Sequence, residues 1–313
     1  MAAFIIRRIV WTIPVILLVI LMIFLMMRQI EGNPFQKTER PVPPQVQENL
    51  ERKFNLDKPV WMQYLLYVKG VFTLDLGPSL NATDRDVMDI IKEHFPRSVK
   101  LGLLAFMWAI IFGVPAGIIA ALRPNTLYDY VLMFCSSIGF ALPSFFIATL
   151  FIYYFAVKFQ VVPVQGWPLG FWDIDSRVIL PSLALGLFPM AYFARLVRGT
   201  MLETMQQDYV RTARAKGLRW RAIVARHVFR NSLIPVVTAT APLFGLVITG
   251  TFVIEVIFSI PGIGRYFVQS VSGRDYAVVM GITVLTSIII ILANLFVDIA
   301  YGFLDPRTRT SKV

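Results

Sequence analysis

Few side chains in this sequence could carry out chemistry by themselves. The 313 residues include one cysteine, Cys135, and two histidines, His94 and His227. A single thiol cannot form an intrachain disulfide, and these three residues are too few for a four-ligand zinc site of cysteine and histidine. The sequence also lacks the Gly-x-x-x-x-Gly-Lys-Ser/Thr loop that holds nucleotide phosphates. We therefore expect no catalytic residues, no metal site and no enzyme activity in this chain.

Polar side chains inside long apolar stretches are the candidates for a transport pathway. An acid inside a membrane is costly, so Glu255 and Asp298 each justify a functional hypothesis. Asn294 would share one helical face with Asp298. Both acids also have structural alternatives, because Glu255 could brace a turn at residues 259–262 and Asp298 could pair with an arginine such as Arg195. The sequence leaves these alternatives open.

Small residues in the same stretches pose a similar choice. Ser136, Ser137 and Ser144 are candidates for lining a pathway, but serine also allows close packing of helices. Gly113 and Gly117 have the four-residue spacing of small-residue packing motifs. We expect these two glycines to serve helix packing rather than gating.

A basic segment from Arg195 to Arg230 could bind a partner. It contains nine lysines and arginines. Asp208 is expected to cap a short helix, and Gly217 suits the left-handed residue that ends it. A second basic helix should follow and end near Pro235, where another apolar stretch begins. Two short helices joined by a glycine would form a stiff knob.

The composition indicates that these residues are positioned by membrane-spanning helices. Hydrophobic residues make up 57% of the chain and charged residues 16%, against about a quarter charged in soluble proteins. Six stretches approach or exceed the ~20 apolar residues that cross a bilayer. They run approximately from Ile9 to Met27, Leu101 to Leu122, Val131 to Val157, Val178 to Leu196, Leu233 to Phe258, and Ala277 to Leu304. We predict an all-α polytopic membrane protein with six transmembrane helices, in which Pro181 and Pro189 interrupt the fourth.

The distribution of Lys and Arg predicts the topology. If both termini lie on one side of the membrane, that side receives fifteen basic and four acidic residues, which accounts for the whole formal charge of +11. The segment from Arg28 to Arg97, on the other side, holds ten basic and ten acidic residues. Because cytoplasmic loops carry an excess of Lys and Arg, we expect both termini and the basic segment in the cytoplasm.

The predicted organisation has four parts. They are the first transmembrane helix with a cytoplasmic N-terminus (1–28), an extracytoplasmic helical loop domain (29–98), a five-helix core with a cytoplasmic loop at 197–232 (99–304), and a cytoplasmic tail (305–313). In the outer domain, Val46, Leu50 and Phe54 recur at four-residue intervals and predict a short helix. This domain is either a cap over the outer helix ends or a surface for a partner or substrate.

Several short motifs follow one another in an order typical of one family. They are Leu74-Asp75-Leu76-Gly77-Pro78-Ser79, Ala141-Leu142-Pro143-Ser144-Phe145, Asp208-Tyr209-Val210-Arg211-Thr212-Ala213-Arg214-Ala215-Lys216-Gly217, Arg230-Asn231-Ser232-Leu233-Ile234-Pro235, Phe258-Ser259-Ile260-Pro261-Gly262-Ile263-Gly264-Arg265, Arg274-Asp275-Tyr276 and Leu304-Asp305-Pro306-Arg307. With these motifs the chain resembles the permease subunits of binding-protein-dependent ABC importers. Within the dipeptide, oligopeptide and nickel branch, it resembles the first permease of the pair, which has a long outer loop after span one. The superfamily's usual Glu-Ala-Ala is replaced by residues 211–213, as is common in the peptide branch.

The resemblance implies a type I ABC importer permease fold. It also implies that this chain takes no direct part in ATP hydrolysis. The implied partners are a second homologous permease, two ABC ATPase subunits that hold ATP and Mg²⁺, and an extracytoplasmic substrate-binding protein, in the inner membrane of a prokaryote. The chain itself would hold no cofactor and would contact the lipid bilayer. The implied ATPase-coupling residues are Asp208, Tyr209, Arg211, Thr212, Ala213, Lys216 and Gly217, and the implied turn at the outer gate contains Pro261, Gly262 and Gly264.

Alternatives remain for the cargo and for the class of protein. We expect di- or oligopeptides, but related machines import nickel chelates, glutathione or short oligosaccharides, because a separate binding protein largely selects the cargo. An ion-coupled secondary transporter would normally show internal repeats, which we do not find. A membrane-anchored regulator that binds DNA would need a third packing helix beside the basic segment, so we expect no nucleic-acid partner.

Overall fold

The structure of the chain is a computed structural model that describes residues 2–29, 55, 57–82, 84–168 and 170–304. The helix predicted at Val46 to Phe54 and the tail 305–313 lie outside the described residues. Within the described part, the chain forms helices and one isolated β-bridge between Pro78 and Asp86. The prediction of an all-α protein is therefore confirmed.

The described helices follow the predicted stretches closely. They are α1 (Ala2–Arg28), α3 (Val60–Thr73), α4 (Val87–Trp108), α5 (Val114–Leu122), α6 (Leu127–Ala141), α7 (Ser144–Phe151), α8 (Ser176–Met205), α9 (Asp208–Ala215), α10 (Trp220–Ile223), α11 (Arg230–Ile257), α12 (Ile263–Ser272) and α13 (Tyr276–Leu304). Short π-helical turns join α4 to α5, extend α7 and join α10 to α11. By length and composition, five continuous described helices could cross a membrane, and a bent pair could form a sixth span.

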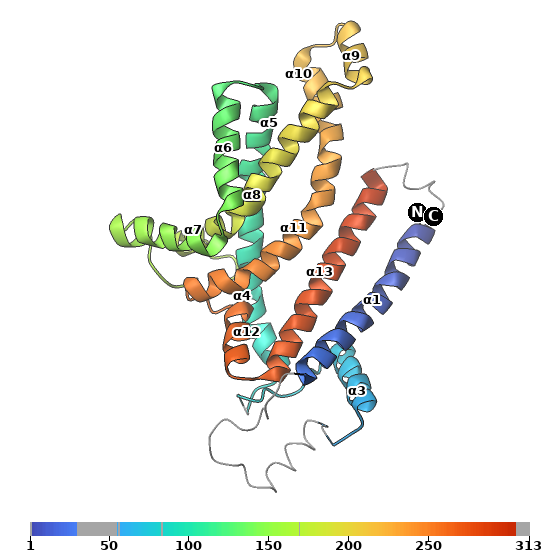
Figure 1. The fold of residues 1–313 in the computed structure, drawn as a ribbon, viewed down its shortest axis with the longest axis vertical. Coiled ribbons are helices and arrows are strands. Elements are labelled where there is room, and N and C mark those ends of the chain that lie inside the picture. Colours follow the sequence, from blue (N-terminus) through green and yellow to red (C-terminus); the bar gives the residue numbers. More distant parts are fainter. Residues whose placement is uncertain (1, 30–54, 56, 83, 169, 305–313) are drawn as a thin grey trace.

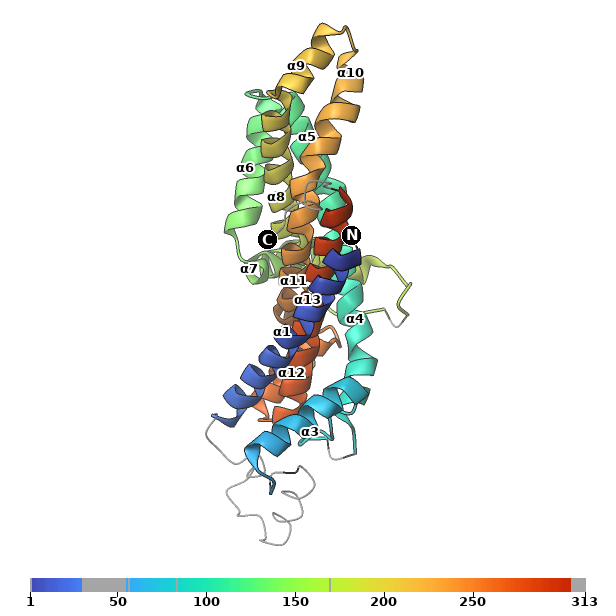
Figure 2. The same ribbon diagram turned by 90° about the vertical axis from the view of Figure 1, so that its right-hand side faces the viewer.

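The helices form an elongated bundle with different structures at its two ends. Helices α9 and α10 project at one end, and α3 and α12 lie at the other (Figures 1 and 2). Helix α1 begins, and α13 ends, on the side that faces α9 and α10 (Figure 1). Helix α4 continues through residue 98, where the outer domain was predicted to end, so one helix joins the predicted outer domain to the core.

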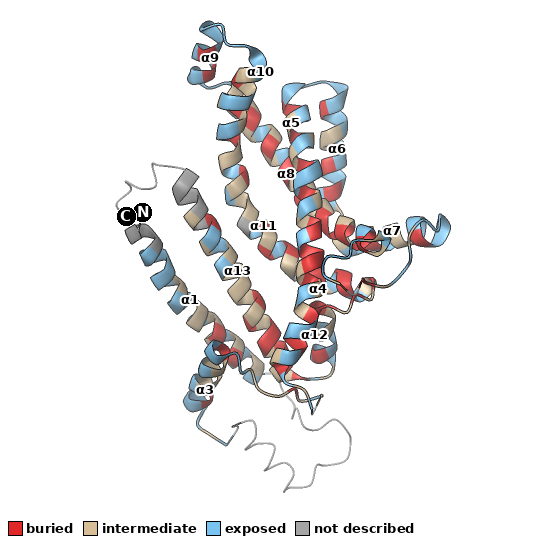
Figure 3. Ribbon diagram, turned by 180° about the vertical axis from the view of Figure 1, so that it is seen from behind, coloured by how far each residue is buried: buried red, intermediate tan, exposed pale blue. Residues whose placement is uncertain are grey.

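Helix α8 forms the centre of the packing. Leu101 of α4, Ala184 of α8 and Ile254 of α11 belong to one buried cluster, and buried residues gather where these helices meet (Figure 3). A β-carbon at Gly113 would lie 2.5 Å from the carbonyl oxygen of Met190, and one at Gly117 would lie 2.5 Å from that of Ala194. Such contacts forbid a side chain, so the packing role predicted for these two glycines is confirmed.

Three expectations about the spans were wrong, all at prolines. The predicted third span is not one helix, because α6 and α7 meet at 106° and α7 projects sideways from the bundle (Figure 1). Leu142 there is extended, with φ −87° and ψ 130°, as a residue before proline prefers, and Pro143 has no N–H to continue the helix. By contrast, α8 runs on through Pro181 and Pro189 as one 30-residue helix.

The third error concerns Pro235. The second basic helix does not end there, because residues Trp220 to Ile257 form one helical run of 38 residues. A proline removes one hydrogen bond from a helix, but polar side chains of neighbouring helices can satisfy the carbonyls near it. Thr200 of α8 donates a 3.2 Å hydrogen bond to the carbonyl of Ser232, beside the proline. The second short helix and the following span are therefore parts of one continuous helix.

Candidate functional site

The basic segment folds into the predicted pair of short helices. Gln207, with φ −68° and ψ 147°, precedes α9, and Asp208 is the first helical residue, so the expectation that Asp208 caps this helix was wrong by one position. The Asp208 carboxylate lies 3.8 Å from Arg211 on the surface. Gly217 has φ +76°, which confirms the left-handed residue expected after the helix.

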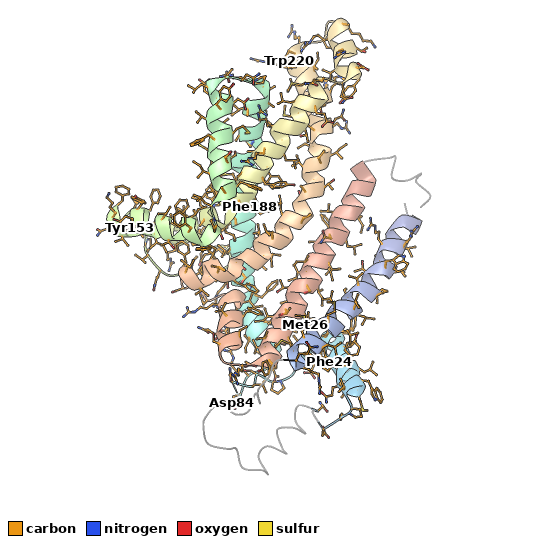
Figure 4. All side chains as sticks on the ribbon, in the orientation of Figure 1. Phe24, Met26, Asp84, Tyr153, Phe188 and Trp220 are labelled. Atoms are coloured by element: carbon orange, nitrogen blue, oxygen red, sulfur yellow. The ribbon has the colours of Figure 1, made fainter. Side chains whose placement is uncertain are left out.

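The two short helices form one packed knob. Val210 and Ala213 are buried in a cluster with Ile223 of α10, so α9 packs on the start of the long helix. The Arg214 guanidinium lies 4.8 Å from the centre of the Trp220 ring, which Figure 4 places in this knob. Such cation–π pairs stabilise exposed contacts by about 0.5–1 kcal/mol. The knob is held internally and can move as a unit.

The predicted coupling residues divide into exposed and buried members. Asp208, Arg211, Thr212, Lys216 and Gly217 are exposed, while Ala213 faces the interior of the knob. The sixth exposed member is Tyr209, whose hydroxyl accepts a 2.9 Å hydrogen bond from the side-chain amide of Asn231. The exposed surface carries three amide or hydroxyl groups and several cations, and can contact an acidic or polar partner.

A buried ion pair lies at the base of the knob. Arg198 of α8 donates two hydrogen bonds, of 2.6 and 2.7 Å, to the Asp129 carboxylate in the first turn of α6. The backbone N–H of Asn125 donates a third at 3.0 Å. Asp129 is 1% exposed, so the pair ties the α5–α6 connection firmly to the helix that leads into the knob. The sequence reasoning counted both charges but did not pair them.

A groove lies where α6 breaks. It has a volume of about 420 Å³, and one of its lining residues, Phe188, is labelled on α8 in Figure 4. Its lining residues are Phe140, Ala141, Leu142, Pro143, Ser144, Leu185, Phe188, Pro189, Leu246 and Val247. Of the three predicted pathway serines, only Ser144 lines it. Ser136 is buried and donates to the carbonyl of Leu132, and Ser137 accepts a 2.7 Å hydrogen bond from Arg195.

Glu255 lies at the far end of the long helix, under the predicted outer turn. Its side chain is fully buried, and Oε2 accepts hydrogen bonds from the backbone N–H groups of Gly264, at 2.7 Å, and Arg265, at 3.1 Å. These groups lie in the first turn of α12, where a carboxylate satisfies free amides and complements the helix dipole. Of the two alternatives for this acid, the geometry supports the brace.

The two glycines of the turn are explained by close contacts with α11. A β-carbon at Gly262 would lie 2.5 Å from the Glu255 carboxyl carbon, and one at Gly264 would lie 2.4 Å from Phe252 Cα. The carbonyl of Pro261 faces α4 and accepts a hydrogen bond from the Arg97 guanidinium at 3.1 Å. The predicted turn is thus a junction of α4, α11 and α12.

Two family matches together cover most of the chain. Residues 113–310 match the binding-protein-dependent transport system inner membrane component family, and residues 1–102 match the N-terminal part of such membrane components. The chain belongs to this family. The resemblance inferred from the motifs is confirmed, and the chain is a multi-pass inner-membrane permease component that is not itself catalytic.

Relatives match this permease along its whole length. The chain is 43% identical over 313 residues to the dipeptide transport system permease protein DppB of Bacillus subtilis (strain 168), and the match covers 100% of this chain and 99% of the relative. It is 42% identical over 309 residues to the oligopeptide transport system permease protein OppB of Escherichia coli (strain K12), which covers 99% of this chain and 100% of the relative. A structure of the MetNI methionine ABC transporter in an inward-facing conformation matches with a TM-score of 0.55 at 15% identity, over 70% of this chain and 97% of that one. This likeness confirms the predicted ABC importer fold.

The other predicted pathway residues of the permease lie on α13. Asn294 is exposed, and its side-chain amide donates a 2.9 Å hydrogen bond to the carbonyl of Ile290. Asp298 belongs to the same helix, and its side chain lies outside the described part of the structure. The pair predicted between Asp298 and Arg195 is therefore untested. The Arg195 guanidinium lies 5.0 Å from the centre of the Phe140 ring.

One polar centre was missed by the sequence reasoning. The Asp275 carboxylate is 1% exposed and accepts hydrogen bonds from the Ser79 hydroxyl at 2.5 Å and from the N–H groups of Leu80 and Asn81 at 3.1 and 3.0 Å. This contact joins two of the matched motifs, which are separated by 196 positions. The only sequence signal was that both motifs occur in the same chain. Among the described residues, no group of three His, Cys, Asp or Glu side chains could hold a metal ion.

Proposed function

We propose that this permease forms half of the membrane pathway of an ATP-driven importer, and that its cargo is di- or oligopeptides delivered by an extracytoplasmic binding protein. The observation that carries this proposal is the similarity over all 313 residues to permeases named for dipeptide transport. The oligopeptide permeases that match at 42% identity support the same cargo class. Nickel chelates, glutathione and short oligosaccharides remain alternative cargoes of the same machine.

The proposed assembly contains a second homologous permease and two ATPase subunits, which bind ATP and Mg²⁺. The knob is proposed to dock into an ATPase subunit through its exposed residues at positions 208–212 and 216–217. Its internal packing and its continuity with α11 support this role, because a rigid lever transmits force better than a flexible loop. This chain is proposed to hold no cofactor of its own.

The proposed orientation places both termini and the loop at 197–232 in the cytoplasm, and residues 29–98 outside. Two independent features support it. The Lys and Arg count assigns all eleven net positive charges to the side of the knob. In Figure 1, α1 begins and α13 ends on that same side.

For the pathway itself we propose the groove at the break in α6, with Ser144 as its polar side chain. Non-helical backbone within a membrane is tolerated where it lines a cavity or is buried in protein, and the groove meets this condition. Ser136, Ser137, Asn294 and Asp298 remain candidates for other states of the pathway.

The proposal is tested by reconstituting the complete complex in vesicles and measuring uptake of a labelled dipeptide and a labelled pentapeptide. We expect uptake that requires both ATP and the binding protein, and that unlabelled peptide reduces. Competition by a nickel chelate, glutathione or an oligosaccharide, without competition by peptide, would show that the cargo is wrong. Uptake that persists without ATP and follows an ion gradient would refute the importer.

A further inference from the structure

The long helix of this permease connects the knob directly to the outer turn. The helical run from Trp220 to Ile257 contains 38 residues and would span about 57 Å at 1.5 Å per residue. Its first residue packs against Arg214 in the knob, and Glu255 lies near its last turn. This continuity gives a displacement of the knob a direct route to Glu255.

Helix α12 depends on Glu255 for the start of its backbone. Its N-cap position is Gly262, which has no side chain to satisfy the free amides of the first turn. These amides are instead satisfied from other helices. Glu255 of α11 accepts from Gly264 and Arg265, and Ser98 of α4 accepts from Ile263 at 2.9 Å. Because its cap is supplied by a different helix, the orientation of α12 follows the helix that supplies it.

The backbone and side chain of Glu255 act on the two ends of the same turn. The Glu255 carbonyl accepts a 2.8 Å hydrogen bond from the N–H of Ile260, at the start of the turn, and its carboxylate holds the two amides after it. The residue between, Ser259, has φ +55°, so the turn is tightly folded. The glycines at 262 and 264 allow the turn to approach α11 closely, so α11 and the start of α12 are tightly packed.

The far end of α12 reaches the outer segment. Asp275, just after this helix, holds the backbone of residues 79–81 through the hydrogen bonds described above. Helix α12 is thus attached to the long helix at one end and to the predicted outer domain at the other. This chain of contacts links the knob to the surface on which a binding protein would act.

We infer that Glu255 is the positioning residue that transmits movement of the knob to α12 and to the outer surface of the permease. The inference rests on the proposed function, because it assumes that an ATPase moves the knob. It assigns to Glu255 a role in coupling rather than contact with the cargo. The side chain suits this role because one of its oxygens accepts hydrogen bonds from two successive backbone amides of α12.

The test uses the complete complex with Cys135 replaced by serine and Val271 replaced by cysteine as the reporter on α12. Val271 is 52% exposed and Cys135 is exposed, so this chain is labelled alone before the complex is assembled and then carries one label, on the helix of interest. A spin label at position 271 reports whether α12 moves when a non-hydrolysable ATP analogue binds. Peptide uptake and basal ATP hydrolysis are measured on the same preparations.

Glu255→Ala should assemble and hydrolyse ATP at the basal rate, while the nucleotide-dependent change at position 271 disappears and uptake falls about tenfold or more. Glu255→Gln can keep both hydrogen bonds through its carbonyl oxygen and should restore most of the response. The control is Thr286→Ala, which removes a buried side-chain hydrogen bond within α13 that does not involve Glu255 and should keep the response. A Glu255→Ala complex with the normal change at 271 overturns the inference, and so does equal loss in Thr286→Ala.

If Glu255→Ala does not assemble, Glu255→Asp decides the question, because it keeps the carboxyl group but withdraws its oxygens by one bond. Assembly with a lost response at 271 supports the inference, and assembly with a full response overturns it. Failure of both variants to assemble would make Glu255 a folding residue and would also overturn it. If unmodified permease responds to nucleotide but takes up no peptide, the proposed cargo is wrong while the role of Glu255 stands.

Discussion

Replacing Gly217 by valine tests whether the angle between the two knob helices is needed for coupling. Gly217 has φ +76°, a conformation that a β-branched residue adopts only under strain. No described atom lies within 4 Å of the position that a β-carbon would take, so the cost comes from the backbone alone. We expect a local cost of about 1–3 kcal/mol, which the knob can relieve by changing its angle.

The structure offers a matched control in the same region. Gly199 lies inside α8 and is exposed, and a β-carbon added there would likewise meet no described atom within 4 Å, but its backbone is helical. Gly199→Val adds the same side chain without left-handed strain. A second variant, Gly217→Asn, should retain coupling, because asparagine tolerates the left-handed region better than other residues with a side chain.

The assay is ATP hydrolysis by the reconstituted complex with and without loaded binding protein, together with uptake. Gly217→Val should lose the stimulation of hydrolysis and the uptake, or lose the ATPase subunits, while the spans remain inserted. Gly199→Val and Gly217→Asn should behave like the unmodified permease. A Gly217→Val complex that retains its ATPase subunits and full coupled transport would refute the reasoning. Equal loss in Gly199→Val would also refute it.

Two further predictions concern topology and the base of the knob. A reporter inserted near Met205 should be cytoplasmic and one near Glu48 external, and an external signal near Met205 would contradict the proposed docking of ATPases. Asp129→Ala leaves the Arg198 guanidinium without its buried partner. Removing one partner of a buried ion pair lowers the free energy of unfolding by about 3–5 kcal/mol, and the lower end applies because Arg198 is 28% exposed. The melting temperature of the purified complex should fall, while Glu93→Ala, at an exposed pair with Arg85, should change it little; equal losses would contradict the assignment.

Much of the fold was predictable because its causes are local. A helix that crosses a membrane needs a run of apolar residues, and such a run is visible without any knowledge of its neighbours. The left-handed turn at Gly217 was predictable for the same reason, because only the residue itself determines whether a positive φ is tolerated. The family motifs added the order of these elements along the chain.

The behaviour of the prolines was not predictable from the sequence. Pro143 ends a helix, whereas Pro189 and Pro235 lie inside continuous helices. A proline removes one donor in every case, and whether the helix continues depends on which neighbouring groups satisfy the freed carbonyls. Such neighbours belong to other helices, so the sequence around a proline does not show them.

The sequence by itself indicated the long apolar segments, the place of the basic knob and the unusual acids. The tertiary structure alone decided what those acids contact. Glu255 caps a helix nine residues away, Asp129 pairs with an arginine 69 positions later, and Asp275 holds a segment 194 to 196 positions earlier. A carboxylate has the same intrinsic chemistry in a pathway, an ion pair or a helix cap, so only the donors brought to it by folding distinguish these roles.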